Sequence, residues 1–160
     1  MTGVQTCALP ISAISEAFNR IEELQAQIDN RVTQTSDQSF AKRLKDATTP
    51  VRAKLEVVRG ELVDWYNHAD QSTLHFPIRL YNMMLSLASQ VQSADAAPTK
   101  QHGEIFNDLS AKVEAQLRAL QQVESTELPA LNKLLLQLEV PPIYVKPGKP
   151  KSIALSGRHQ

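Results

Sequence analysis

The sequence predicts an all-α protein, an antiparallel up-down bundle of three to four long helices with an extended C-terminal tail. Apolar residues recur at spacings of three and four over most of the chain, as on the buried face of an amphipathic helix. Short polar connections separate these stretches, and such connections make consecutive helices run antiparallel. The alternating pattern of a β-strand is not apparent in the sequence.

Composition limits the classes of protein that we expect. The chain has 160 residues, of which 42% are hydrophobic, enough to fill the core of one domain. Its 17 basic and 17 acidic residues cancel, so neither nucleic acid nor an anionic membrane is an expected partner. The sequence contains no run near the roughly 20 apolar residues that a transmembrane helix needs. We therefore expect one bundle domain over residues 12–139 and a Pro- and Lys-rich tail over residues 140–160.

Residues 1–11, MTGVQTCALPI, read codon by codon as the translation of a short-read library adapter. We therefore expect this segment to be non-native, with the native reading beginning near Ser12 or Ala13 inside a longer open reading frame. Cys7, the single cysteine, lies in the segment. The native part then has no thiol for a disulfide, a Cys-ligated zinc site or a nucleophile.

The first helix is expected from Ala13 to Val32. Its apolar stripe consists of Ile14, Phe18, Ile21, Leu24, Ile28 and Val32. The polar turn over residues 33–39 offers Ser36 or Asp37 as the cap of the second helix.

The second helix is expected to continue through Pro50. Its stripe keeps one phase across the proline and consists of Phe40, Leu44, Ala47, Val51, Leu55, Val58, Leu62 and Trp65. Because a new start would usually reset the phase, one helix kinked at Pro50 is favoured. The alternative is a break, with Thr49 as N-cap and Pro50 at the first helical position.

The third helix follows a connection over residues 67–77 that Leu74 and Phe76 anchor. It is expected to begin near Pro77. Its apolar face is broad enough to be sandwiched between neighbours, and comprises Leu80, Tyr81, Met84, Leu85, Leu87, Ala88 and Val91.

The fourth helix is expected to begin near Pro98. Its stripe consists of Phe106, Leu109, Val113, Leu117, Leu120 and Val123, continued by Leu128, Leu131, Leu135 and Leu138. Pro129 either kinks one long helix or marks a restart that Ser125 or Thr126 caps.

The tail from Val140 is rich in proline and is expected to be extended or disordered. Its residues 143–145, Ile-Tyr-Val, are candidates for a short pairing segment. Lys146, Lys149 and Lys151 alternate with prolines, a composition typical of a solvated tail more often than of a polyproline recognition segment.

No sequence pattern predicts a catalytic, cofactor-binding or metal site. A di-iron bundle needs a Glu three residues before a His, but the residues in that position are Trp65, Ser72, Thr99 and Ser156. His68 and His75, with Asp64 or Asp70, have no spacing typical of a ligand pair, and solvated loop histidines are favoured. The glycines are too scattered to cradle a phosphate.

Two further groups were weighed as candidate sites. Glu22 and Glu23 are adjacent carboxylates on a polar face, where solvated charges are favoured over an acid and base tuned by burial. Trp65, Tyr66 and Tyr81 suggest a ligand platform, but the phase of Trp65 favours core packing.

Part of the chain resembles a known family. The string FPIRLYNMMLSLASQVQSADAAPTKQHGEIFNDLSAKVEAQL from residue 76, followed by LPALNKLLLQLEVPPIYV, is similar to the C-terminal helical region of large sortilin-like BNR/Asp-box repeat β-propeller proteins, often labelled glycosyl hydrolases. The most specific elements are FPIR, residues 76–79, and SADAAPT, residues 93–99. Residues 12–65 resemble the same region only in pattern.

This resemblance implies an upstream β-propeller as partner, and export from the cytoplasm to a secreted or periplasmic location. The chain lacks the Asp-box motif Ser-x-Asp-x-Gly-x-x-Trp, so no active-site residue carries over. We therefore expect a non-catalytic accessory domain of a larger propeller protein. The alternative is a self-standing interaction bundle that forms a homo-oligomer through Tyr81, Met83 and Met84. A small enzyme is the least favoured class, because polar groups converge on no predicted inner face.

Overall fold

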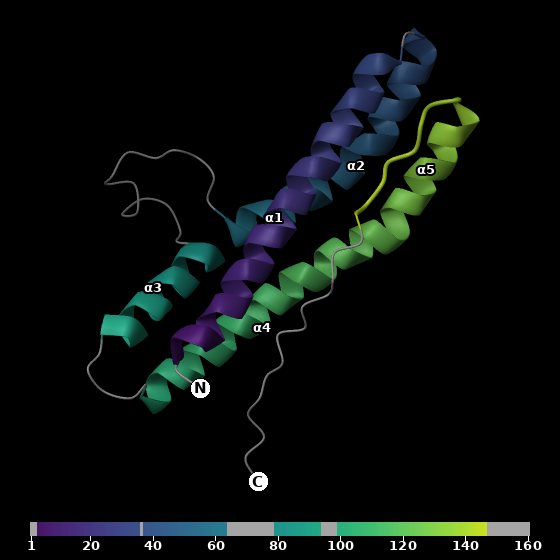
Figure 1. Ribbon diagram of the computed structural model, residues 1–160. Coiled ribbons are helices and arrows are strands. Elements are labelled where there is room, and N and C mark those ends of the chain that lie inside the picture. Colours follow the sequence, from purple (N-terminus) through teal and green to yellow (C-terminus); the bar gives the residue numbers. More distant parts are fainter. Residues whose placement is uncertain (1–2, 36, 64–78, 94–98, 147–160) are drawn as a thin grey trace. The chain divides into compact units, whose positions relative to one another are not determined.

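The computed structural model describes residues 3–35, 37–63, 79–93 and 99–146. These residues form α1 (Gly3–Gln34), α2 (Gln38–Leu62), α3 (Leu80–Ser93), α4 (Lys100–Gln122), the π-helical η2 (Val123–Glu127) and α5 (Leu128–Gln137) (Figure 1). No strand occurs in this part of the chain. The predicted all-α helical bundle is confirmed.

The chain divides into two compact units. Of the described residues, 3–16, 60–63, 79–93 and 99–116 belong to unit 1, and 17–35, 37–59 and 117–146 belong to unit 2. Buried apolar side chains described in unit 1 are Cys7, Ala13, Ile14, Leu62, Leu80, Met84, Leu87, Leu109 and Val113. Those in unit 2 are Ala17, Ile21, Leu24, Ile28, Leu44, Val51, Leu55, Val58, Leu120, Val123, Leu128, Leu131, Leu135, Leu138 and Ile143. The domain boundaries expected after residues 11 and 139 stay predictions.

Helix α1 begins well before the predicted start at Ala13, which was wrong. Cys7, Pro10 and Ile14 are spaced by three and four residues and are buried, so they extend the apolar stripe toward the N-terminus. Pro10 lies inside the helix. The boundary expected after residue 11 is therefore not a helix boundary, and the foreign origin of residues 1–11 stays a prediction.

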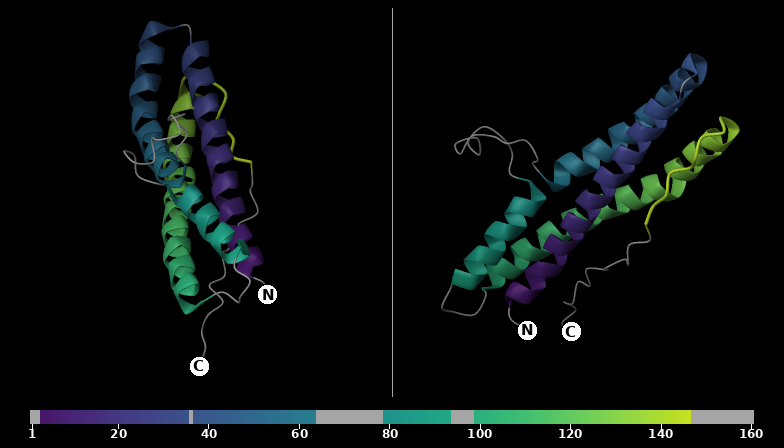
Figure 2. Two further views of the ribbon diagram at one scale, coloured as in Figure 1. Left: turned by 90° about the vertical axis from the view of Figure 1, so that its left-hand side faces the viewer. Right: turned by 45° about the horizontal axis from the view of Figure 1, so that its top comes forward.

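Asp37 caps α2, one of the two caps that the sequence offered. Its Oδ1 accepts hydrogen bonds from the backbone N–H groups of Ser39 at 2.8 Å and Phe40 at 3.3 Å. Hydrogen bonds from Ser39, and then from Phe40, hold the pKa of Asp37 below its ordinary value. The turn lets α2 return antiparallel to α1 within unit 2 (Figure 2).

Helix α2 runs through Pro50 as one helix, as favoured from the phase of its stripe. The alternative start at Thr49 is wrong. The hydroxyl groups of Thr48 and Thr49 donate back to the carbonyl of Lys45, at 3.1 and 2.8 Å, as they do inside a helix. Phe40 was placed on the buried stripe but is exposed in the first turn.

Helix α3 buries Leu80, Met84 and Leu87 in unit 1, whereas α4 buries Leu109 and Val113 in unit 1 and Leu120 in unit 2. Leu85 is 42% exposed, so the broad sandwiched face predicted for α3 is wrong. Thr99 caps α4, because its Oγ1 accepts the N–H of His102 at 3.3 Å while its own N–H donates to the Nδ1 of His102 at 3.3 Å. The connection 67–77 with its anchors, and the expected starts at Pro77 and Pro98, lie outside the described residues.

Between α4 and α5 the helix widens into the π-helical turn η2. The N–H of Leu128 donates to the carbonyl of Val123, five residues earlier. Both ends of the turn keep helical backbone angles and neither has a side-chain cap, so of the two alternatives at Pro129 the restart capped by Ser125 or Thr126 is wrong. Val123 and Leu128 are both buried although five residues separate them, and the wider turn accommodates that spacing.

A Schellman motif ends α5 and turns the chain back. The N–H of Val140 donates to the carbonyl of Leu135 at 2.9 Å, and that of Glu139 donates to Leu136 at 3.2 Å. Glu139 has a φ of 55°, the left-handed conformation of this motif. Residues 140–146 then run back along unit 2 without helix or strand (Figure 1).

Candidate functional site

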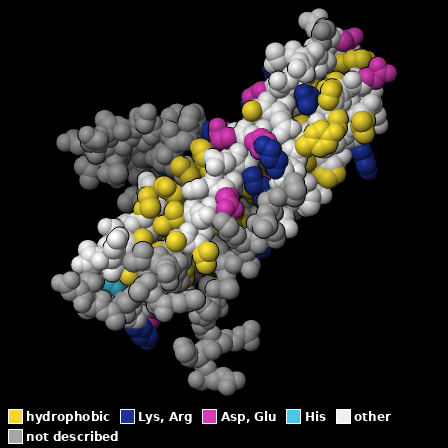
Figure 3. Space-filling view, viewed as in Figure 1, with side chains coloured by type: hydrophobic (Ala, Val, Ile, Leu, Met, Phe, Trp, Pro, Cys, Tyr) yellow, Lys and Arg dark blue, Asp and Glu magenta, His cyan; other side chains and the backbone are white. Residues whose placement is uncertain are grey.

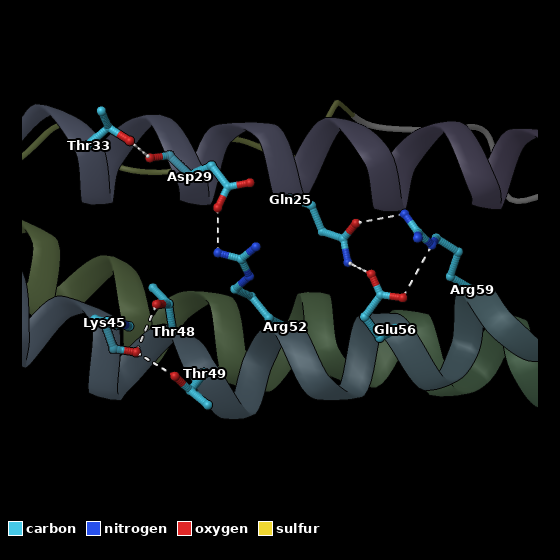
Figure 4. Close-up of polar contacts among 9 residues, drawn as sticks. All are labelled: Gln25, Asp29, Thr33, Lys45, Thr48, Thr49, Arg52, Glu56 and Arg59. Carbon is cyan, nitrogen blue, oxygen red and sulfur yellow. Dashed lines mark hydrogen bonds and ion pairs between the residues drawn. The ribbon is translucent and has the colours of Figure 1, made fainter. Parts of the chain in front are cut away.

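The polar residues of unit 2 form a ladder between α1 and α2 (Figure 4). Asp29 of α1 pairs with Arg52 of α2. One to two turns away, Gln25 of α1 accepts a hydrogen bond from Arg59 at 3.3 Å and donates one to Glu56 at 2.9 Å. The ladder therefore uses acids and amides of α1 against mainly basic residues of α2.

Arg59 is the most buried charge of this ladder. Its side chain is 7% exposed and pairs with Glu22 of α1, and with Glu56 of its own helix at 3.4 Å. A buried guanidinium loses its hydration and needs charged partners to compensate. Glu22, by contrast, is 47% exposed and keeps contact with water. The pair is thus asymmetric, with the basic side far more dependent on the contact.

Two further ion pairs join η2 to the other helices of unit 2. Arg20 of α1 pairs with Glu124, and Lys54 of α2 pairs with Glu127. With the α1–α2 ladder, each of the three helical segments is ion-paired to the other two. An exposed pair such as Lys54–Glu127 contributes about 0–1 kcal/mol, so it aligns the helices more than it stabilises them.

Glu124 is held in a partly dehydrated position. Its side chain is 11% exposed, and its Oε1 is buried without a hydrogen-bond partner. Burial raises the pKa of Glu124 above its ordinary value, although Arg20 acts in the opposite direction. Arg20 likewise has a buried Nε without a hydrogen-bond partner. This pair therefore costs desolvation that its single contact does not fully offset.

A third set of polar contacts holds residues 141–146 against α1 and α5. Asn132 accepts the N–H of Ile143 at 2.7 Å and donates to its carbonyl at 2.9 Å. Gln27 accepts the N–H of Tyr144 at 3.0 Å and donates to its carbonyl at 2.9 Å. We call Gln27, Arg31 and Asn132 the segment clamp, because Arg31 donates to the carbonyl of Pro141 at 2.9 Å. The sequence pattern did not predict this clamp.

Charges of both signs are mixed on the surface. On the face drawn in Figure 3, the described Lys and Arg side chains lie among Asp and Glu side chains and form no field of one sign. Unit 1 has pairs of its own, such as Arg79 with Glu61 at 3.3 Å and Lys112 with Asp108 at 2.7 Å. This mixing accords with the balance of 17 basic and 17 acidic residues.

The adjacent carboxylates of α1 that were candidates for an acid–base pair make structural contacts. Glu22 and Glu23, expected to be solvated, are partly exposed but pair with Arg59 and with Lys146, the latter at 2.9 Å. Tyr81 is half-buried on α3.

The other candidates considered lie outside the described residues: His68, His75, Asp64, Asp70, Trp65, Tyr66, Lys149 and Lys151. Among the described residues, no three His, Cys, Asp or Glu side chains gather closely enough to hold a metal ion. No helix in the described ranges combines the length and apolar character needed to cross a bilayer.

Comparison with known proteins gives no relative. No family model, no curated protein and no solved structure matches the chain.

Proposed function

We propose that the chain is a non-catalytic helical accessory domain of a larger protein. The observation that supports this most is the use of the acidic and basic side chains of unit 2. Glu22, Asp29 and Glu124, carboxylates of the kind an acid–base site needs, each pair with an arginine of another helix. Side chains committed to such contacts orient helices, a structural task.

The larger protein that we propose is a BNR-repeat β-propeller of the sortilin-like kind, with the propeller as the partner of the bundle. Support comes from FPIR at residues 76–79, SADAAPT at residues 93–99 and the stretch ending in VPPIYV. The last of these contains the residues that the segment clamp holds. Secretion or periplasmic export follows as part of the same proposal.

One experiment tests the accessory role. The uninterrupted coding sequence upstream of Ser12 is recovered, and the parent protein is expressed with and without the region that begins there. We expect propeller repeats upstream and a lower thermal midpoint of the propeller when the bundle is removed. An upstream sequence without such repeats, or a propeller midpoint that does not change, contradicts the proposal.

A second experiment tests the absence of catalysis. The purified chain is assayed against chromogenic glycosides beside its E22Q and E104Q variants, which change a buried-arginine contact and an exposed carboxylate respectively. We expect no turnover above the buffer rate from any of the three. Turnover by the unmodified chain that is lost in one of these variants contradicts the proposal.

A second candidate function is self-association through α3. The described surface of α3 exposes Met83 and Leu85, apolar side chains that favour such a contact. Met84, also expected on that face, is fully buried and is removed from it. Sedimentation velocity tests this candidate: a dimer that L85K disrupts and S86K, at the neighbouring exposed position, preserves would support it. A monomer at every concentration contradicts it.

A further inference from the structure

The contacts of residues 141–146 differ from ordinary packing of a chain end. In an extended chain, the N–H and C=O of one residue point to the same side, and those of the next residue point to the opposite side. Asn132 of α5 bonds both groups of Ile143, and Gln27 of α1 bonds both groups of Tyr144. Two helices therefore hydrogen-bond to the backbone of two consecutive residues of an extended segment from opposite sides.

The remaining contacts fit the two prolines that precede these residues. Proline has no N–H, so only its carbonyl needs a partner, and its ring favours the extended conformation. Arg31 supplies that partner, donating to Pro141 at 2.9 Å and to Pro142 at 3.5 Å. At the other end, Glu23 pairs with Lys146.

The side chains of Ile143 and Tyr144 differ in burial. Ile143 is 3% exposed and forms part of the core of unit 2, whereas Tyr144 is 68% exposed. The contacts thus accommodate two prolines, and they select one buried aliphatic side chain and an extended backbone. They do not select the tyrosine ring.

The covalent link to α5 brings the segment to this position, but the clamp contacts themselves involve only residues 141–144 and the helices. The link passes through Glu139, which takes a left-handed conformation that residues other than glycine rarely adopt. The segment is held by contacts that a separate peptide of the same sequence would also make.

We propose that the segment clamp, together with the buried position that Ile143 occupies in unit 2, forms a binding site for an extended Pro-Pro-Ile peptide, and that the chain's own residues 141–146 are its resident ligand. The site belongs to a class that recognises backbone amides and one aliphatic anchor. It is independent of the accessory role proposed above, because it depends only on contacts inside unit 2.

The experiment uses the full chain with Ile143→Asp, which places a carboxylate at a buried apolar position and so displaces the resident segment. A fluorescein-labelled peptide of residues 139–147 is titrated into this variant, and binding is followed by fluorescence anisotropy. We expect saturable one-to-one binding, at least tenfold weaker to the unmodified chain because its site is filled. Adding Asn132→Leu to the variant is expected to weaken binding at least tenfold.

Matched peptides test what the site reads. A peptide with Tyr144→Ala is expected to bind within threefold of the parent peptide, and one with Ile143→Asp at least tenfold more weakly. Absence of binding to a variant that keeps its helical circular dichroism overturns the proposal, as does equal binding of all three peptides. An unmodified chain that sediments as a dimer, lost in the Ile143→Asp variant, overturns the assignment of the resident ligand to the same chain.

If Ile143→Asp loses its helical circular dichroism, amide exchange in the unmodified chain decides instead. A resident ligand opens separately from its site. The amides of Ile143 and Tyr144 should therefore exchange faster than those of Ile21 and Leu24, and with a smaller dependence on urea. Exchange of all four only through global unfolding overturns the proposal.

Discussion

The guanidinium of Arg59 on α2 lies buried against the half-exposed carboxylate of Glu22 on α1. Arg59, which is cut off from water, therefore depends on this contact more than Glu22 does. Without Glu22 the arginine stays dehydrated with fewer charged partners, whereas without Arg59 the glutamate turns to water. This asymmetry has a measurable consequence for stability.

Replacing Glu22 should therefore cost more than replacing Arg59. We expect E22A to lower the free energy of unfolding by about 1–2 kcal/mol. R59M keeps an apolar side chain of similar length in the buried position and should change it by less than about 1 kcal/mol. Urea denaturation at neutral pH measures both, with D46A at an exposed position of α2 as the control. A larger loss for R59M would be contrary to the asymmetry.

The cap formed by Asp37 should make stability depend on acid pH. Its folded pKa is lowered, so its contribution is present above the ordinary pKa and is lost as pH falls through the folded value. D37A should lower the thermal midpoint at neutral pH, and D37N, which can still cap, should lower it less. The gap between the parent chain and D37A should close on acidification. D46N serves as the control, and a gap that stays constant down to acid pH would refute the assignment.

The contribution of Glu124 to stability should depend on pH in the opposite direction to that of Asp37. Its folded pKa is raised, so the stability it contributes is present below the ordinary value of 4.5 and is lost as pH rises through the folded pKa. E124Q cannot ionise, so the parent chain should lose stability relative to E124Q as pH rises from acid to neutral. Urea midpoints across that range test this, beside the exposed E104Q. Parallel curves for the parent chain and E124Q would be inconsistent with a buried carboxylate.

The left-handed residue that ends α5 offers a test of backbone strain. Glycine takes this conformation without steric cost, so E139G should raise the free energy of unfolding by roughly 1 kcal/mol. The same replacement inside a helix has the opposite effect. E104G in α4 should lower the free energy of unfolding by about 1 kcal/mol. Equal signs for the two variants in urea denaturation would rule out strain at Glu139.

The helices were predictable because apolar spacing carries most of the information on helical structure. The continuous phase of the stripe across Pro50 predicted a single α2, and Asp37 was one of the two residues, with Ser36, expected to cap it. The start of α1 was missed because residues 1–11 were set aside on their origin, although Cys7 and Pro10 continue the stripe.

The π-helical turn left a signal in the sequence that was not used. Val123 and Leu128 lie five residues apart, whereas the other steps of that stripe are three or four. An α-helix would carry such a pair to different faces, and a wider turn brings both into the core. Pro129 marks the same position in the sequence for another reason. It lacks the N–H that an α-helix uses, so a kink or a restart was expected there.

The contacts of unit 2 were beyond prediction from spacing. Helical periodicity tells which face of α1 carries Glu22 and Gln27, but not which residues of α2 or of the tail face them. The clamp contacts made by α1 join residues more than 100 positions apart, as Gln27 and Tyr144 show. Ile143 was expected in an extended or disordered tail, as a candidate for a short pairing segment, and its burial follows the turn at Glu139.

The central claim is that charged side chains of unit 2 serve to join its helices. A double-mutant cycle of E22A, R59M and the two combined, measured by urea denaturation, tests it most directly. We predict a favourable coupling free energy of about 0.5–1.5 kcal/mol between Glu22 and Arg59. A coupling of zero would mean that the two side chains contribute independently, and would contradict the account.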